Sequence, residues 1–577
     1  MMAAKHRTLR AIDVGRGLKL HRFETSGGLP VTVAQRGRIP LVAVRLVLSS
    51  GAAGDPPGKE GLADFTMRLL RRGTARRDAH ALDEAIEFVG ASLGLFAGED
   101  QVAVALTTPA EHLPAMLEVL SELARVPSFP EEEVHTERDR SLGQFANDVD
   151  DPSLLADRAL IRTAWAAHPY GHDVTGTRAS VARFHRQDPI EFHAAHFGPR
   201  PAQLFVVGAV DPDTVARQIE DAFAPWTAGP AGGVEIPPPG GVARAGTVVV
   251  VDRPEQTQSQ VRLAGPAYRR GAPVQFAAQV VNVTLGAGFT SRLVREVRVK
   301  RGLSYGVGSS FDTLRAGGLF SVSSFTKVET TGKLLSVMRQ EVDRMRERGP
   351  TQAEVEKAQR YLAGLFPLRT ETNESLAAVL ADMALYGLGD DWLDRYQDRV
   401  RAVTRVEARE AAARYCFPDP PLTVVVGPAE RLRSQLEKYG RWRSSPPTTC
   451  CDSRPLVRGR PAGGGQAGRR AGHPRAERGR GCSPSRAARG PAGTKAVGRS
   501  PARPRHLGGP PLRPRRADAP GGERRLRAGA GRQAVPRAGL AAAARTGPGG
   551  RCAGACASLP DAGRRSGPLS GGETSAR

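Results

Sequence analysis

Two pairs of histidines are the first residues in this 577-residue chain whose spacing could suit a metal ion. His193 and His196 are three positions apart, and His168 and His172 are four apart. A catalytic zinc site also needs a third ligand and a general base, and neither pair encloses a glutamate as His-Glu-x-x-His does. His168 opens a Pro-Tyr-Gly turn, where helical spacing does not hold. We therefore interpret both pairs as structural.

Glycines and cysteines give no stronger sign of a ligand site. Gly286-Ala-Gly288 lacks the Gly-Lys-Ser/Thr ending of a phosphate-binding loop, so we predict a turn that opens a helix over 289–299. Cys416 is the one cysteine before residue 441, which excludes a disulfide framework in that part and fits a reducing compartment. Cys552 and Cys556 lack the second pair that a zinc site requires.

The elements that would carry any site are strands in runs, with long helices between the runs. The helices predicted nearest to candidate groups cover 58–71, 130–147 and 289–299, and typical strands cover 42–50 and 258–264. This grouping indicates an α+β fold rather than alternating βαβ units.

A long repeat divides the body of the chain. Val44-Arg45-Leu46 recurs as Val261-Arg262-Leu263, an offset of 217. The phrases starting at Asp188 and Thr404 both look like helix N-caps with an acid three residues on, and a Val-Val-Gly strand follows each. We predict two homologous domains, over 16–228 and 246–440, joined by a Gly/Pro-rich linker over 229–245.

Charge separates the body from the remaining residues, 441–577. The whole chain carries +24, of which 28 arginines, one lysine and six acids place +23 after residue 440. The body is thus balanced, which argues against a nucleic-acid-binding fold. The last 137 residues are mostly Gly, Pro and Arg with one aromatic residue, so they cannot bury a core. We interpret them as a disordered or frameshift-derived tail, with an Arg-rich RNA-binding arm as the alternative.

No stretch approaches the 18 apolar residues of a membrane span, and the N-terminus lacks the apolar region of a signal peptide. We therefore expect a soluble cytoplasmic protein that binds no membrane, unless a misassigned start conceals a signal.

Several phrases resemble the insulinase/pitrilysin family of zinc peptidases. Gly61-Leu62-Ala63 and Gly73-Thr74 match the flanks of the family's His-x-x-Glu-His motif, and His168-Pro-Tyr-Gly171 is another family phrase. The segment from Gly286 to Tyr305 closely resembles the family's C-terminal domain. The resemblance covers nearly all of 16–440. It implies two domains of the insulinase and mitochondrial-processing-peptidase type, each an antiparallel sheet backed by helices.

The zinc motif itself is absent at the aligned positions. Asp64 and Arg68 stand where the resemblance implies histidine ligands, and Met67 stands where it implies the general base. The third ligand falls on Gln144, or on Gly143 or Phe145 if the register slips. We expect no metal ligand and no catalytic residue in this chain, and an Asp64–Arg68 ion pair on the helix instead.

The family's substrate-gripping pair is retained. An arginine and a tyrosine seven positions later hold the substrate backbone in the family, and here they correspond to Arg298 and Tyr305. The neighbouring Arg292, Arg295, Lys300 and Arg301 leave open that Arg298 is only one more solvated charge.

The resemblance therefore implies a chain that is inactive alone. We expect the non-catalytic subunit of a heterodimeric metallopeptidase, with a homologous partner that carries the zinc and an unfolded peptide as substrate. The alternative is a structural or peptide-holding homologue with no role in proteolysis.

Overall fold

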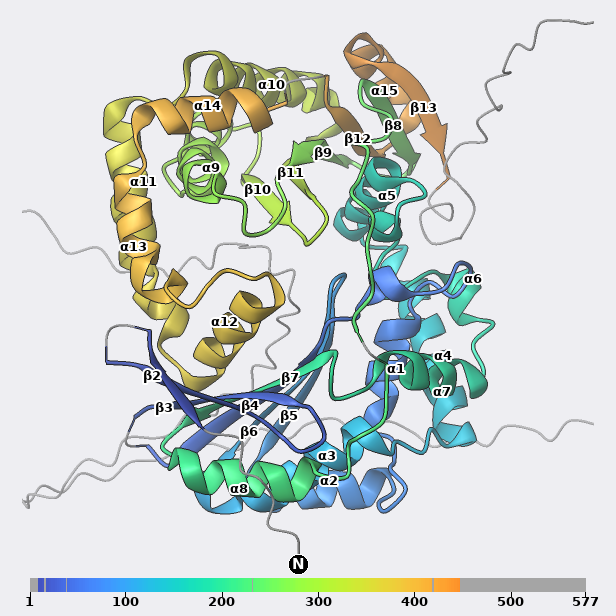
Figure 1. Cartoon of the computed structure of the whole chain (residues 1–577). Helices are drawn as coiled ribbons and strands as arrows, with labels where there is room; N and C mark the ends of the chain where they lie inside the picture. The colour runs from blue at the N-terminus through green and yellow to red at the C-terminus, as the bar shows by residue number, and fades with distance from the viewer. Residues whose placement is uncertain (1–8, 15–16, 38, 231, 418–419, 447–577) are drawn as a thin grey trace, which may run out of the picture. The chain divides into compact units, whose positions relative to one another are not determined.

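The computed structural model describes residues 9–14, 17–37, 39–230, 232–417 and 420–446, which all belong to one compact unit. Within this unit the chain forms two halves, and each half is built on one sheet with helices packed against it (Figure 1). The α+β class expected from the sequence is confirmed.

The N-terminal sheet has seven strands in the order β1-β2-β3-β7-β4-β6-β5. The β3–β7 pair is parallel and the other neighbours are antiparallel. The strands are β1 (Arg10–Asp13), β2 (Lys19–Glu24), β3 (Pro30–Gln35), β4 (Leu41–Leu48), β5 (Ser92–Ala97), β6 (Val102–Pro109) and β7 (Ala202–Gly208).

The C-terminal sheet has six strands in the order β10-β11-β9-β12-β8-β13. The pairs β8–β12 and β8–β13 are parallel, so both sheets are mixed rather than purely antiparallel. The strands are β8 (Thr247–Asp252), β9 (Gln258–Ala267), β10 (Val307–Thr313), β11 (Gly318–Lys327), β12 (Leu422–Gly427) and β13 (Arg441–Ser445).

The two sheets share one topology. The order β3-β7-β4-β6-β5 in the first half is matched by β8-β12-β9-β11-β10 in the second. Register agrees as well, because Val44 lies opposite Val206 and its repeat counterpart Val261 lies opposite Val425. The sequence repeat therefore corresponds to a duplicated sheet.

Helices of the first half cover one face of its sheet. Alternate strand residues such as Val44 and Leu46 pack against them in a single core. The helices and turns of the first half, among which α5 does not pack on this sheet, are η1 (Ala52–Gly54), α1 (Leu62–Leu70), α2 (Ala79–Glu87), η2 (Ala110–His112), α3 (Leu113–Arg125), α4 (Glu131–Asp148), α5 (Pro152–Trp165), η3 (Pro169–Gly171), α6 (Arg178–Val181), α7 (Gln187–His196) and α8 (Pro212–Phe223).

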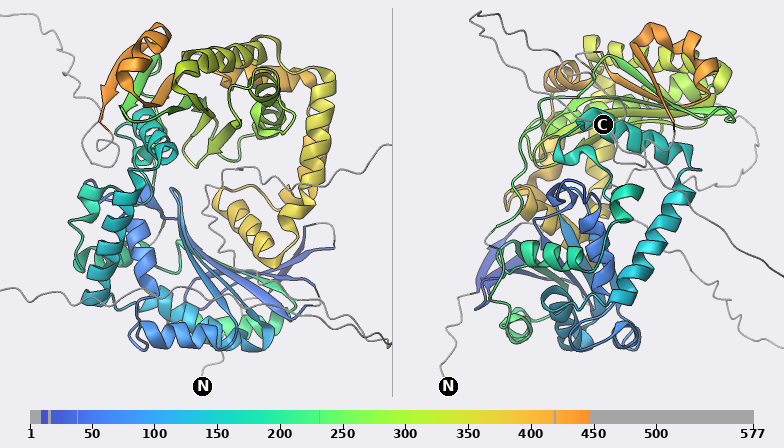
Figure 2. Two further views of the ribbon diagram at one scale, coloured as in Figure 1. Left: turned by 180° about the vertical axis from the view of Figure 1, so that it is seen from behind. Right: turned by 90° about the vertical axis from the view of Figure 1, so that its right-hand side faces the viewer.

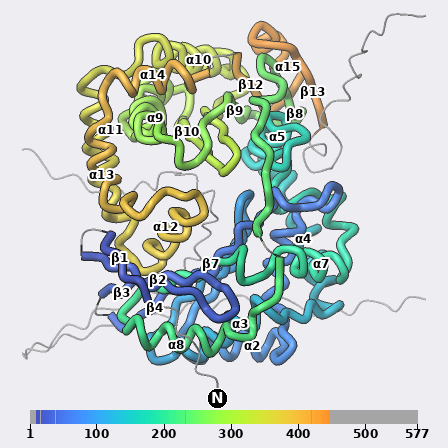
Figure 3. The backbone as a smooth tube through the Cα atoms, in the orientation of Figure 1, coloured from blue at the N-terminus to red at the C-terminus, as the bar shows by residue number. Residues whose placement is uncertain are grey.

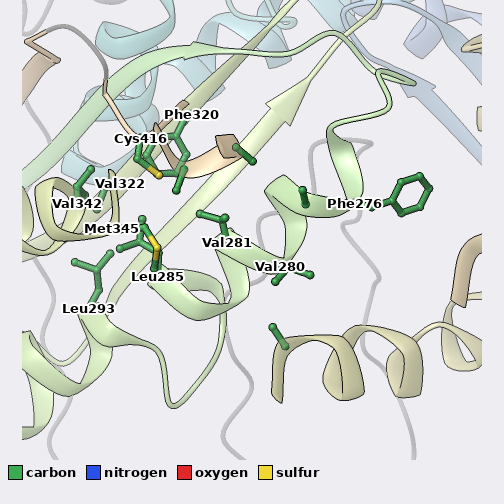
Figure 4. Packing of buried hydrophobic residues seen from close by; sticks show 14 of the residues in the cluster. Phe276, Val280, Val281, Leu285, Leu293, Phe320, Val322, Val342, Met345 and Cys416 are labelled. Carbon is green, nitrogen blue, oxygen red and sulfur yellow. The ribbon is translucent and has the colours of Figure 1, made fainter. Parts of the chain in front are cut away.

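Helices of the second half surround a core to which α9, α10 and β11 contribute side chains (Figure 4). Cys416 is fully buried in this core. The elements are α9 (Gln275–Asn282), two π-helical turns η4 (Val283–Ala287) and η5 (Val294–Val299), η6 (Val328–Thr330), α10 (Thr331–Arg348), α11 (Gln352–Leu365), η7 (Pro367–Thr370), α12 (Asn373–Leu385), α13 (Trp392–Ala402), α14 (Arg405–Tyr415), α15 (Ala429–Leu436) and η8 (Glu437–Tyr439).

One helix of each half packs on the sheet of the other half. The apolar side of α5 joins β8, β9 and β12 in one cluster, whereas α12 contacts β4 and β7. In the ribbon views the teal α5 accordingly lies against the green strands, and the gold α12 lies against the blue strands (Figures 1 and 2). Figure 3 shows the course of the backbone through α5 and through α12. The exchange joins the two halves through buried apolar surface.

Two details differ from the sequence prediction. The Thr404 capping box is present, but Asp188 is not a helix cap: α7 begins one residue earlier, and the Asp188 carboxylate accepts a hydrogen bond from the backbone N–H of His185. We expected the tail to begin after residue 440, but residues 441–445 form the strand β13, which pairs with β8 and so belongs to the C-terminal sheet.

The rest of the predicted tail, 447–577, lies outside the described residues. Among the described helices, none is long and apolar enough to cross a membrane.

Candidate functional site

Helix α1 corresponds to the helix predicted over 58–71 but begins later, at Leu62 directly after Gly61. Gly61 has φ +93°, and a Cβ at this position would lie 2.5 Å from the carbonyl oxygen of Thr175, so only glycine fits. The Asp55 carboxylate accepts hydrogen bonds from the backbone N–H groups of Gly61 and Ala63, at 2.7 and 2.8 Å. These contacts fix the start of α1 and therefore the places of the residues that follow.

The three motif positions on α1 form a charge pair and a core residue. Arg68 Nε lies 2.8 Å from Asp64 Oδ2, which confirms the predicted ion pair. The same guanidinium reaches Glu137 on α4, with Nη1 3.6 Å from Oε1. Met67 is 1% exposed and packs in the core. A permanent cation thus lies between two carboxylates at the place where the resemblance implied a metal.

Burial changes the protonation of Asp64. It raises the pKa of Asp64 to about 6, against the opposing effect of the Arg68 charge. Glu137, whose side chain is 3% exposed, is also held by Arg140 Nη1 at 3.1 Å. Sequence reasoning missed Glu137, although it lies seven residues before Gln144, two helical turns away on the same face of α4.

The third-ligand candidates on α4 supply no carboxylate. The Gln144 amide donates a 2.7 Å hydrogen bond to Asp148, whose other carboxylate oxygen accepts from Arg158 at 2.7 Å. Gly143 has no side chain, and Phe145 is buried with the Arg158 guanidinium 5.3 Å from its ring centroid. None of the three candidate positions therefore provides a carboxylate as third zinc ligand.

The donors in this region do not fit zinc. Asp64 and Glu137 are both bound to Arg68, and no imidazole is present at the motif positions. Across the described parts of the chain, no group of three His, Cys, Asp or Glu side chains is placed to hold a metal ion. The position holds a cation that belongs to the chain itself.

The histidine pairs lie in structural contacts. His193 Nε2 donates to the carbonyl oxygen of Ala124 at 2.9 Å, and burial lowers the pKa of His193 to about 4. His196 packs against the Phe192 ring. His168 Nδ1 accepts the N–H of the turn residue Tyr170, which agrees with its interpretation as a turn residue.

Arg298 and Tyr305 come together although seven residues separate them. Arg298 lies in η5, the chain turns at Gly302 with φ +56°, and Tyr305 stands just before β10. The Arg298 guanidinium carbon is 4.4 Å from the centroid of the Tyr305 ring and 5.4 Å from that of Phe289. Both rings are mostly exposed, at 67% and 71%. Sequence reasoning missed Phe289, for which spacing gave no signal.

Arg298 differs from the other cations of its segment. Glu296 lies 3.4 Å from Arg295, 2.8 Å from Lys300 and 2.5 Å from Arg301, and hydrogen bonds from Lys300 and Arg301 lower the pKa of Glu296 to about 2. Arg292 lies 2.6 Å from Glu354. Among the described residues no carboxylate forms an ion pair with Arg298.

Comparisons with known proteins agree with this architecture. Residues 31–178 match the family described as Insulinase (Peptidase family M16), and residues 183–362 match the Peptidase M16 inactive domain. An uncharacterized zinc protease of Streptomyces coelicolor is 28% identical over 413 residues, which cover 71% of this chain and 90% of the relative. An uncharacterized zinc protease of Bacillus subtilis is 21% identical, covering 72% of this chain and all of the relative.

Solved structures show the same fold. The crystal structure of a peptidase M16 inactive domain from Pseudomonas fluorescens aligns with a TM-score of 0.67 and 25% identity, covering 71% of this chain and 98% of that one. A protease from Helicobacter pylori aligns with a TM-score of 0.65. The two family matches together span more than half of the sequence, and the chain belongs to the insulinase family of peptidases, peptidase family M16.

Proposed function

We propose that this chain is the non-catalytic subunit of a two-chain M16 peptidase. A homologous partner carries the zinc, and this chain supplies Arg298, Tyr305 and part of the chamber that holds an unfolded peptide. The degenerate motif supports the absence of catalysis from this chain, because Arg68 engages the carboxylates at the former metal position.

One observation carries the proposal: Arg298 lacks a carboxylate partner among the described residues and lies 4.4 Å from the ring of Tyr305. Its neighbours on the same segment are all paired. Stacking against an aromatic ring uses the face of a guanidinium and leaves its N–H edges for a ligand. A solvated surface charge would require no such neighbour.

The chemistry of the pair suits a peptide carbonyl. The guanidinium and the phenol both donate hydrogen bonds, and two donors on one carbonyl oxygen orient the backbone and stabilise negative charge that develops there. Main-chain hydrogen bonds along a sheet edge would hold the rest of an extended peptide. Neither donor depends on the identity of the substrate side chains.

The test is reconstitution with an M16 homologue from the same genome that retains His-x-x-Glu-His. Cleavage of an unfolded fluorogenic peptide should require both chains. Changing Arg298→Ala and Tyr305→Phe together should slow turnover by about 10²–10³, the usual cost of a lost transition-state donor. Size-exclusion chromatography should show both chains still associated, and the zinc content should not change.

Arg295→Ala is the matched control, because Arg295 lies on the same segment and is paired with Glu296. It should leave turnover within about twofold of the parent, as expected for an exposed ion pair. Full activity of the double variant in an intact complex would refute the proposed grip. That result would favour the structural homologue instead.

A further inference from the structure

Arg45 lies on the face of the N-terminal sheet that α12 covers. Along β4, Val44 points into the helix-backed core, whereas Ala43 and Val47 join the cluster that contains the apolar residues of α12. Arg45 lies two residues from both Ala43 and Val47 along β4, so its side chain points to the same apolar face of the sheet as theirs. Its guanidinium carbon lies 5.3 Å from the centroid of the Phe96 ring.

Among the described residues, none accepts a hydrogen bond from the guanidinium of Arg45. Its Nε is buried, and the described residues offer it no acceptor and no ion pair. Burial lowers the pKa of Arg45, and the charge of Asp382 on α12 opposes this shift. Asp382 is itself engaged, since its Oδ2 lies 3.3 Å from Arg270 Nη2. A buried donor in this condition costs stability unless a partner reaches it.

The repeat provides an internal reference. Arg262 is the counterpart of Arg45, on β9, and it faces the exchanged helix α5 as Arg45 faces α12. Arg262 Nε donates to Asp157 on α5 at 2.7 Å, and its Nη2 donates to Ser153 Oγ at 2.7 Å. In the second half, side chains of α5 therefore accept the hydrogen bonds of Arg262. In the first half, no described residue accepts a hydrogen bond from Arg45 Nε.

Further cations surround the same carboxylate. The Nε of Arg270 is also buried without an acceptor among the described residues, and Arg369 lies within electrostatic range of Asp382. The nearby Asp100 is already bound, because it accepts hydrogen bonds from the hydroxyls of Tyr170 and Tyr386 at 2.6 and 3.2 Å. Three guanidinium groups thus lie within electrostatic range of Asp382, and among the described residues only Arg270 forms an ion pair with it.

We propose that Arg45 and Arg270 form a binding site for a carboxylate anion between the N-terminal sheet and α12. A carboxylate offers two acceptor oxygens, which match the N–H donors that guanidinium groups present. It can come from the C-terminus of a bound peptide or from a small free carboxylate. The peptide source rests on the function proposed above, and the free source does not.

The first arm of the test compares two peptides of one sequence, one with a free C-terminus and one with an amide. With the full chain, or the complex, the acid should bind at least about tenfold more tightly in a fluorescence-anisotropy titration, as expected for a charge-assisted pair. Arg45→Met keeps the contact with Phe96 but removes the donors, so the ratio should fall to about one. Arg22→Met is the control, because Arg22 already has Asp390 at 2.5 Å.

The second arm uses sodium acetate, with sodium chloride at the same ionic strength as reference. Acetate should raise the melting temperature of the parent chain and of Arg22→Met, but not of Arg45→Met. If acetate raises the melting temperature but the acid and amide peptides bind equally, the site binds a small free carboxylate and not a peptide C-terminus. The proposal is overturned if neither effect occurs in the parent, or if both persist in Arg45→Met.

The two arms separate this inference from the proposed function. The Arg298→Ala/Tyr305→Phe variant should weaken both peptides alike and keep their ratio. If no peptide binds the parent at all, the proposed function fails while the acetate arm still decides the carboxylate site.

Discussion

Replacing Arg68 by methionine removes the cation that joins α1 to α4 at the position where the resemblance implies a metal ligand. Methionine keeps the aliphatic volume, so the change isolates the charge. It leaves Asp64 without its ion pair, and leaves Glu137 with Arg140 as its other basic partner. The loss should appear as a lower free energy of unfolding.

The exposure of the three side chains sets the magnitude. Arg68 is 39% exposed, while Asp64 is 19% and Glu137 3% exposed. An exposed pair contributes about 0.2–1 kcal/mol, and breaking a buried pair costs about 3–5 kcal/mol. We expect a loss of about 1–2 kcal/mol at pH 8, between these limits, because water screens the outer part of Arg68.

The loss should depend on pH in a definite direction. The folded-state pKa of Asp64 is about 6, above its ordinary value of 3.8, so stability falls as pH rises through this window. Removing Arg68 takes away a charge that lowers this pKa, and the cost therefore grows where Asp64 is ionised. The difference between parent and variant should be larger at pH 8 than at pH 5, where Asp64 is protonated in both.

Urea unfolding at the two pH values, followed by circular dichroism, measures the difference. The control is Arg71→Met at the C-cap of the same helix, since Arg71 pairs with the more exposed Asp83. It should cost less than about 1 kcal/mol with no such pH dependence. A deficit for Arg68→Met that is equal at both pH values, or no larger than that of Arg71→Met, would contradict the bridging role.

Two further predictions concern the metal position and the C-terminal boundary. Restoring the zinc motif should require a carboxylate on α4 as well as the residues of α1, so the triple variant should bind zinc weakly and the quadruple variant tightly, as measured by calorimetry with zinc alone. The four changes are Asp64→His, Met67→Glu, Arg68→His and Gln144→Glu. Deleting 447–577 should change the melting temperature by less than about 2 °C. A deletion that also removes β13 should lower it clearly, because β8 loses its edge partner and the core loses the half-buried Trp442 side chain.

Much of the fold could be predicted from the sequence because local signals and global topology agree. The strand predicted over 42–50 occurs as β4, the helix over 130–147 as α4, and the offset of 217 corresponds to a shared register in both sheets. The helix expected over 289–299 is shorter, since its regular part is the π-helical turn η5. Arg298 and Tyr305, selected from the sequence by their spacing, lie side by side in the structure.

The rest depends on packing that no local pattern encodes. The apolar residues of α12 indicate that the helix packs against a sheet, but not which one. The sequence therefore did not predict that α12 packs on the N-terminal sheet and α5 on the C-terminal sheet. Glu137 carries no motif of its own, and its importance comes from the reach of Arg68 across to α4. The strand β13 was not predicted, because the arginine-rich composition that indicates the tail already starts at Arg441.

The exchange of α5 and α12 has a consequence for the order of events on the ribosome. When residues 10–223 have emerged, the N-terminal sheet can form, but α12 has not yet been translated. Ala43, Val47, Phe205 and Val207 then face solvent, and the apolar side of α5 has no sheet to cover. At about 5–20 residues per second, at least 150 further residues keep this surface bare for several seconds to half a minute. A chaperone that binds nascent chains would therefore contact the N-terminal half before α12 is available to cover it.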